Sequence, residues 1–310
     1  MLSYTIRRLL LIVPTLFVVL VVTFALAHAA PGGPWDKEEA KRQSPAIIDN
    51  LNRKYGLDRP LPEQFGLYLW NVLHGDLGVS LSQRDREVKQ IIGDALPVSA
   101  RLGVQAILLA LAISVPLGVI SALRQNSAID YASLLLATAG TSIPSFVLAI
   151  FAIYVFAVIV PWFPVSGWGD GDMRHVFLPS LVLAVGSCAF LTRITRASVL
   201  EVIRQDYVRT ARAKGLHEHV VVAVHVLRNA LIPVVTVLGP ATAFIITGTF
   251  FIEYMFSIPG LGRWFVNSLF ARDYPLLLGI YLLFAFVISL ANLTVDLLYG
   301  VLDPRIKVAR

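Results

Sequence analysis

The stretch DYVRTARAKGLHEH, residues 206–219, separates two segments of this chain that are almost entirely apolar. It contains two acidic residues, two histidines and three Lys or Arg residues. Charged connections between long apolar runs are typical of loops that join membrane-spanning helices, because charged side chains remain in water. The flanks of this stretch therefore predict an integral membrane protein.

The composition of the whole chain indicates the same class. The 310 residues are 56% hydrophobic and 15% charged, whereas an ordinary soluble domain is about 25% charged. A hydrocarbon core about 30 Å thick requires about 20 mostly apolar residues for each helix that crosses it. Six runs predict an all-α, polytopic membrane protein with six transmembrane helices: Leu9–Ala29, Leu102–Leu123, Tyr131–Val160, Phe177–Leu191 (the shortest), Ala230–Ile252 and Leu276–Tyr299.

The first run resembles a signal peptide, since Arg7 and Arg8 precede it and Ala27-His28-Ala29 ends it. Its apolar part is about 20 residues long, whereas the apolar part of a signal peptide is about 7 to 15. We therefore expect an uncleaved first span. The single cysteine, Cys188, lies in an apolar run, so no disulfide framework is available within the chain.

Basic residues predict that both termini are cytoplasmic. Arg7 and Arg8 precede the first span, Arg305, Lys307 and Arg310 follow the last one, and the connection 193–228 holds seven Lys or Arg. Such residues gather on the cytoplasmic side, so the net charge of +6 is attributed to topology and not to nucleic acid. The connection between the first two spans is also basic, but it is about 70 residues long and exceeds the length over which the charge rule acts. We expect residues 1–93 to form the first span with a long extracytoplasmic loop, and residues 94–305 to form a five-span core.

Motifs for chemistry on the chain itself are missing. The sequence has no G-x-x-x-x-G-K-[ST] phosphate loop and no H-E-x-x-H zinc pair, so we expect neither ATP hydrolysis by this chain nor another enzymatic activity. His217, Glu218, His219 and His225 form a tempting cluster, but on a helix His217 and His219 point about 200° apart. We therefore expect no metal site and no cofactor there.

Polar residues and prolines also occur within the predicted spans. Ser289, Asn292 and Asp296 recur at helical spacing, which predicts that they face the protein interior as packing contacts or as a lining for solute. Neighbouring helices in a membrane satisfy the carbonyls that proline frees, so the prolines permit kinks. They are Pro116, Pro144, Pro179, Pro233 and Pro240.

The opening stretch itself predicts a short helix over Asp206–Lys214, ended by Gly215 in a left-handed conformation. After it, Leu216, Val220, Val224 and Leu227 recur at helical spacing and lead into the fifth predicted span. The result is a charged helical elbow. It is either an ordinary connecting loop or a docking surface for a soluble partner.

Several motifs along the chain resemble one family. RTARAKGL (209–216) and LRNALIPV (227–234) resemble the cytoplasmic loop of ABC importer permeases, in the branch that transports peptides. The general pattern of these permeases, E-A-A, three residues, G, nine residues and I-x-L-P, is matched only at Ala211, Gly215 and Leu227, and the peptide branch departs from it in the same way. Similar motifs continue along the chain, and the B-type oligopeptide permeases are the most similar group: RRLLLIVPTLF, APGGP, YGLDRPLPEQF, GDLGVSL, LPVSARLG, IPSFVLA, EYMFSIPGLG, RDYP and LDPRI.

The resemblance implies the type I ABC importer permease fold (MetI-like), a location in the cell inner membrane, and import of oligopeptides or dipeptides. It also implies four kinds of partner: a second homologous permease, two ATP-binding subunits, an extracytoplasmic peptide-binding protein and membrane lipid. In the coupling loop, at about 199–228, the residues that would dock in an ATPase groove are Arg209, Thr210, Ala211, Arg212, Lys214 and Gly215. Nickel and glutathione importers share much of the pattern, so the cargo stays open.

A second predicted site lies in FIEYMFSIPGLG, where Glu253, Pro259, Gly260 and Gly262 suit a turn at the bilayer surface. With Asn292 and Asp296 they are candidates for the translocation pathway or for a receptor contact, and the alternative is a plain loop. Two other classes remain to be separated by co-purification of ATPase subunits. One is an autonomous channel or carrier, and the other is a membrane enzyme that uses the acids and histidine of the first loop: Asp58, Glu63, His74 and Asp76.

Overall fold

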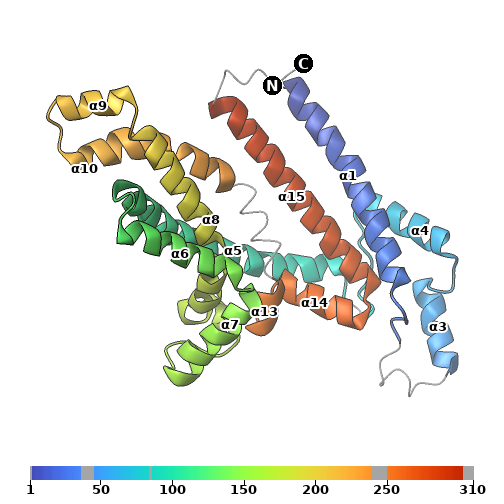
Figure 1. The fold of residues 1–310 in the computed structure, drawn as a ribbon. Coiled ribbons are helices and arrows are strands. Elements are labelled where there is room, and N and C mark those ends of the chain that lie inside the picture. Colours follow the sequence, from blue (N-terminus) through green and yellow to red (C-terminus); the bar gives the residue numbers. More distant parts are fainter. Residues whose placement is uncertain (1, 36–44, 84–85, 239–249, 303–310) are drawn as a thin grey trace. The chain divides into compact units, whose positions relative to one another are not determined.

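A computed structural model describes the chain except for residues 1, 36–44, 84–85, 239–249 and 303–310 (Figure 1). The described part is helical, and its one β contact is an isolated bridge between Val79 and Glu87. Four helices are long and apolar enough to cross a membrane: α1 (Leu2–Ala29), α5 (Val88–Leu123), α8 (Met173–Val202) and α15 (Tyr274–Leu302). Two bent helix pairs raise the count to six if each pair is one span. The all-α membrane fold is confirmed, and four helices, or six if each bent pair is one span, are candidate spans by length and composition.

The third predicted span is divided into two helices. Helix α6 (Ala128–Ser142) ends before Pro144, and α7 (Ser145–Ile153) begins after it and continues into the π-helix η1 (Tyr154–Ile159). Ile143 has φ −95° and ψ 124°, the extended conformation that a following proline favours. The run expected as one long span is therefore a pair of helices with a sharp bend between them.

Helix α8 corrects the length of the fourth predicted span. The apolar run ended at Leu191, whereas the helix extends from Met173 to Val202. Pro179 lies inside this helix without ending it. The apolar run ends before Arg193 because that residue is charged. The helix continues past it because a charged side chain does not interrupt the backbone hydrogen bonds of a helix.

The fifth predicted span, Ala230–Ile252, lies partly outside the described residues, which omit 239–249. It is approached by α10 (Glu218–Val220), the π-helix η3 (Val221–Val226) and α11 (Leu227–Ala230). Beyond residues 239–249, the chain forms α13 (Phe250–Met255) and α14 (Leu261–Ala271). The long first loop contains α3 (Pro45–Tyr55) and α4 (Leu61–Leu73), and a short 3₁₀ turn, η2 (Gly169–Gly171), precedes α8.

Contacts divide the chain into two compact units. One comprises residues 99–258 and 291–310, and the other residues 2–98 and 259–290. In the first unit, α5 and α8 pack closely at Gly118, where an added Cβ would lie 2.6 Å from the Thr195 Cβ. Their interior contains Ala110, Ala184 and Leu191, together with Val234.

Candidate functional site

The helix expected over Asp206–Lys214 is present as α9 (Asp206–Ala213), at the end of α8 (Figure 1). Gly215 follows with φ +78°, a left-handed conformation that favours glycine. An added Cβ would meet no atom within 4 Å at this position. The requirement for glycine here therefore comes from the backbone and not from crowding.

One side of α9 is packed firmly. Val208 and Ala211 are buried in a cluster that also contains Ala122 of α5 and Val199 of α8. The remaining buried members come from the helices that follow α9: Val221, Val226 and Ala230. Because a buried apolar cluster holds its members at close packing density, α9 is seated on the ends of two long helices.

The other side of α9 is polar and exposed. Arg209, Thr210 and Lys214 lie at the surface. Arg212 makes two hydrogen bonds to Glu218, from Nη2 to Oε1 at 2.6 Å and from Nε to Oε2 at 3.1 Å. This bond to Glu218 raises the pKa of the Arg212 guanidinium. The pair closes the turn that contains Gly215, so the shape of the elbow is fixed from both sides.

The elbow differs from the sequence expectation in two details. Residues Leu216 and Val224 are exposed, whereas Val221 and Val226 are buried. Helix η3 is a π-helix with i→i+5 hydrogen bonds, so Val221 and Val226, five residues apart, share its buried face. The α-helical repeat used for the prediction assumed a tighter winding and therefore assigned other residues to that face.

The second correction concerns the histidines. His217 has extended backbone angles (φ −61°, ψ 139°) as the N-cap of α10, so it is not within the helix. Its ring stacks on that of His219 with centroids 5.6 Å apart, where a helical arrangement predicted opposite directions. In the part of the chain that the structure describes, no group of three or more His, Cys, Asp or Glu could hold a metal ion.

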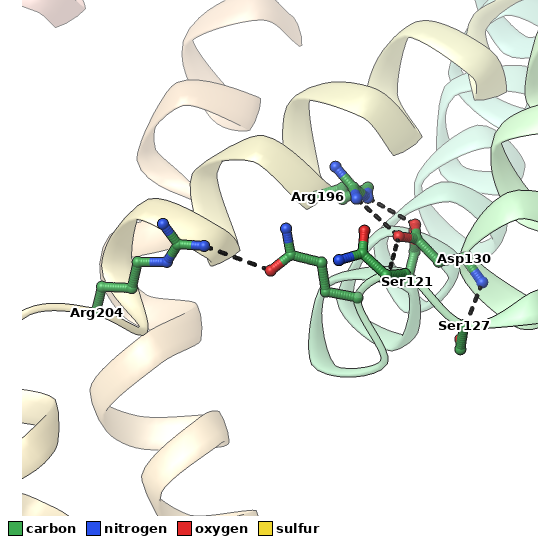
Figure 2. Close-up of polar contacts among 7 residues, drawn as sticks. Ser121, Ser127, Asp130, Arg196 and Arg204 are labelled. Carbon is green, nitrogen blue, oxygen red and sulfur yellow. Dashed lines mark hydrogen bonds and ion pairs between the residues drawn. The ribbon is translucent and has the colours of Figure 1, made fainter.

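A buried carboxylate beside the elbow was missed at the sequence level. Asp130, on α6, accepts hydrogen bonds at 2.7 Å from both Nε and Nη2 of Arg196 on α8 (Figure 2). The Ser121 hydroxyl of α5 also donates to Asp130, and the Asn126 N–H donates at 2.9 Å. We call Ser121, Asp130 and Arg196 the Asp130 cluster. It joins three helices, next to the apolar cluster that seats α9.

Two sequence signals could have indicated this cluster. Ser127 is the N-cap of α6 and accepts from the Asp130 N–H at 3.3 Å, which makes S-x-x-D a helix-start signal. Arg196 is one of two arginines, with Arg193, that follow within five residues of the end of an apolar run. What the sequence could not give is their pairing across 66 positions.

The other unit contains a second buried carboxylate, Asp273, which directly precedes α15. It accepts hydrogen bonds from the hydroxyls of Ser80 and Ser82, the latter at 2.7 Å, and from the Ser82 N–H at 2.9 Å. It also accepts from the N–H of Leu276 at 3.3 Å. We call Ser80, Ser82 and Asp273 the Asp273 cluster. It links the GDLGVSL motif to the RDYP motif.

The predicted pathway residues have mixed positions. Glu253 is completely buried on α13, so it is not a surface acid, and Pro259 is exposed. Gly260 is the N-cap of α14 and Gly262 lies within that helix. Asn292 is exposed on α15 within this chain.

The helical spacing of Ser289, Asn292 and Asp296 predicted that they share one face of α15, but it did not predict what covers that face. Ser289 is half-buried on the same helix. The backbone of Asp296 continues α15, and its side chain lies outside the described ones.

The acids and histidine of the first loop make local contacts. Glu63 pairs with Arg59 at 2.9 Å, and the Asp76 carboxylate accepts from the Gly78 N–H at 2.8 Å. The Nδ1 of His74 lies 2.8 Å from the carbonyl oxygen of Trp70. These contacts stabilise helix ends and turns, and they do not assemble an active site from these four residues.

Comparison with known proteins identifies the class. Residues 114–308 match the family model described as the inner membrane component of binding-protein-dependent transport systems, and residues 1–103 match the model of its N-terminal part. The chain belongs to this family of transport permeases.

Individual relatives are similar over their whole length. The dipeptide transport system permease protein DppB of Bacillus subtilis (strain 168) is 42% identical over 308 residues, covering 99% of each chain. The oligopeptide transport system permease protein OppB of Escherichia coli (strain K12) is 40% identical over 307 residues, covering 99% of this chain and all of the relative. The similarity therefore extends along nearly the whole length of these permeases.

A solved structure supports the fold independently. The inward-facing MetNI methionine ABC transporter matches with a TM-score of 0.54 at 17% identity, over 69% of this chain and 97% of that one. At this identity the likeness concerns the fold alone. It agrees with the type I importer permease architecture that the motifs implied.

Proposed function

We propose that this chain is the permease subunit of an ATP-driven importer of oligopeptides or dipeptides. In this proposal it forms the translocation pathway with a second, homologous permease, and two ATP-binding subunits act on its coupling loop. An extracytoplasmic binding protein delivers the peptide. The full-length similarity to peptide permeases supports the cargo, and the arrangement of α9 supports the coupling.

The observation that carries the coupling role is the two-sided character of α9. Val208 and Ala211 fix it to the ends of α5 and α8, while Arg209, Arg212 and Lys214 are exposed. A short helix that is packed rigidly on one side and exposed on the other can bind a partner subunit and transmit its displacement to the helices on which it is packed. The coupling residues are thus Arg209, Thr210, Ala211, Arg212, Lys214 and Gly215, with Ala211 on the seated side.

The path of the motion continues through the Asp130 cluster. A displacement of α9 acts on α5 and α8 through the apolar cluster. Asp130 ties α6 to both of them through Ser121 and Arg196. Packed helices move as bodies with small relative shifts. In the proposed mechanism ATPase closure therefore rotates α5, α6 and α8 as one body, and no bond is made or broken on this chain.

The translocation pathway is proposed to run along α15 and the second permease. Asn292 is exposed on α15, and an exposed amide on an apolar helix suits a protein–protein or solute-lined surface better than lipid. Glu253, Pro259, Gly260, Gly262 and Asp296 complete the proposed set. Normal uptake of every peptide by a Glu253→Ala transporter would remove Glu253 from it.

Topology is part of the proposal. The chain is placed in the inner membrane with both termini and α9 on the cytoplasmic side. Basic residues on the connection 193–228 and at both termini support this orientation, because the positive-inside rule acts on residues close to span ends.

Reconstitution tests the function as a whole. The tagged chain is purified from its native host in mild detergent, and the co-purifying subunits are identified and assayed for ATP hydrolysis. Vesicles that contain the complex and the binding protein are then loaded with ATP and offered a labelled dipeptide, a longer peptide, glutathione or Ni²⁺. We expect ATP-dependent uptake of peptide only.

Three outcomes would contradict the proposal. Transport by the chain without ATPase subunits would indicate a channel or carrier. Uptake of Ni²⁺ or glutathione in preference to peptides would retain the permease class and correct the cargo. A purified chain that brings no ATP-hydrolysing subunit would argue against the whole assembly.

A further inference from the structure

Helix α4 has an apolar surface that its own chain leaves uncovered. Leu67, Trp70 and Leu73 are 42%, 63% and 73% exposed, and no residue of this helix is buried. Apolar surface gains about 25 cal/mol for every Å² that is removed from water, so three such side chains on 13 residues indicate a missing contact. Contiguous apolar patches of this kind mark interaction sites.

The opposite side of α4 is held against the first span. The Phe65 ring makes edge contacts with Phe17 and Phe24 of α1, with centroid distances of 6.2 and 5.2 Å. Phe24 and Phe17 lie about 8 and 18 Å before the end of α1 at Ala29, at 1.5 Å of rise per residue. The contact is therefore deep in the span and not at its end.

This depth places α4 beside the hydrocarbon core. A leaflet contributes about 15 Å of a core that is about 30 Å thick, so Phe65 lies at the level of acyl chains. Helix α1 also carries exposed apolar side chains on faces turned away from this contact, namely Val18, Val22 and Leu26. Both helices therefore expose apolar side chains on the sides turned away from their mutual contact.

Charged groups lie at both ends of α4 and not in its middle, where the polar side chains are those of Tyr68, half-buried, and Asn71, exposed in the last turn. Arg59 and Glu63 form an ion pair at the N-terminal end, and His74 and Asp76 follow the C-terminal end. Trp70 belongs to the residue type that membrane–water interfaces favour. An apolar centre with polar ends and an interfacial Trp is the pattern of a helix that is partly inserted in one leaflet.

We infer that α4 is a membrane-inserted helix, with Leu67, Trp70 and Leu73 in contact with the acyl chains of the leaflet at the C-terminal end of α1. This inference is independent of the transported cargo. It makes the first loop a part of the membrane-embedded body, because α4 fixes it between α1 and lipid.

Spin-label accessibility tests the inference in the assembled transporter. Cys188→Ser leaves the chain without a cysteine, and single cysteines are then placed at Leu67 or Trp70. Asp49→Cys, on the exposed polar side of α3, is the reference for water, and Val18→Cys, on exposed α1, is the reference for lipid. Each variant is purified with its co-purifying subunits, labelled, and reconstituted in vesicles of phosphatidylethanolamine and phosphatidylglycerol.

Collisions with oxygen report lipid, and collisions with a water-soluble nickel chelate report water. We expect labels at Leu67 and Trp70 to match the Val18 label, with an oxygen-to-nickel ratio several-fold above that of the Asp49 label. A ratio equal to that of Asp49 would show that α4 faces water. Low accessibility to both reagents would show a protein partner on this face, and either result overturns the inference. Leu67→Cys is the conservative variant, and it decides the test if Trp70→Cys does not assemble.

Discussion

Two of the buried carboxylates, Asp130 and Asp273, are located at the start of a helix, yet they are satisfied differently. Asp130 is paired with a cation, since Arg196 donates two bonds to it, and it connects three helices. Asp273 is held by hydroxyl and backbone N–H donors, and it connects a loop to α15. Removing Asp130 would leave a charge behind, whereas removing Asp273 would leave only neutral donors.

This difference matches what each cluster holds. Helices α5, α6 and α8 carry the elbow, and a bidentate ion pair resists both separation and rotation of the helices that it joins. The Asp273 cluster secures a loop against a helix start, for which neutral donors suffice. Of these two clusters, the one with the charged pair lies beside the proposed coupling helix.

The largest expected effect follows from replacing Asp130 by Asn. Arg196, whose side chain is 21% exposed, would keep its charge without a partner. Breaking a buried ion pair from one side costs about 3 to 5 kcal/mol. We expect a loss of this size in the free energy of unfolding, measured by denaturant titration of the purified complex.

Two matched variants sharpen this test. Glu63→Gln removes the Arg59–Glu63 pair, whose side chains are 48% and 53% exposed, and we expect a change below about 1 kcal/mol. The double variant Asp130→Leu with Arg196→Met should be more stable than either single change, because no charge is left buried. Equal losses of unfolding free energy for Asp130→Asn and Glu63→Gln would show that the buried ion pair contributes no more than an exposed one.

The second effect concerns Asp273→Asn. The amide keeps one acceptor oxygen but cannot receive all the donors from Ser80, Ser82 and Leu276, and a buried donor left without an acceptor costs about 1 to 3 kcal/mol. Asp76→Asn is the control, since this exposed residue receives one backbone N–H. We expect the Asp273 variant to lose less stability than Asp130→Asn but more than the control in the same titration. A loss above that of Asp130→Asn would reverse the ranking.

The third effect concerns the elbow beside the Asp130 cluster. Gly215 has φ +78° with free space around it, so Gly215→Val strains only the backbone, by about 1 to 2 kcal/mol. Asn tolerates the left-handed region, which makes Gly215→Asn the matched control. We expect the Val variant to insert in the membrane but to lose uptake and ATPase association, measured by co-purification and vesicle transport. Retention of both by the Val variant would count against the coupling role of α9.

The smallest effect is expected at the Arg212–Glu218 pair. Its side chains are 40% and 57% exposed, so Glu218→Gln should change the free energy of unfolding by less than about 1 kcal/mol. Because exposed pairs are screened by salt, the difference should diminish further at 1 M ionic strength, where screening acts over about 3 Å. A large loss that is insensitive to salt would place this pair among the buried ones.

Local signals predicted the elbow well because its determinants are contiguous. The Ala and Arg residues of α9 are strong helix formers, and Gly215 supplies the left-handed end within the same stretch. The buried side of η3 was not predictable in this way. Its π-helical winding changes which residues share a face, and nothing in a run of valines distinguishes the two windings.

The prolines give a second example of a feature that the local sequence does not decide. Pro144 separates α6 from α7, whereas Pro179 lies inside α8, although both occur in apolar runs. The local rule disfavours helix before each of them equally. The surrounding packing decides whether the freed backbone groups find partners, so the sequence indicates where a break is possible but not whether it occurs.

By itself, the sequence determined the class: apolar runs of span length fix an all-α membrane protein, and motifs distributed from residue 7 to residue 306 indicate the permease family. These conclusions depend on local composition and order, which the chain carries in one dimension. The tertiary structure decided which residues act together. The pairing of Asp130 with Arg196, the meeting of Asp273 with Ser80 and Ser82, and the seat of α9 join positions far apart in the chain. Such contacts depend on how helices pack, and no local pattern encodes them.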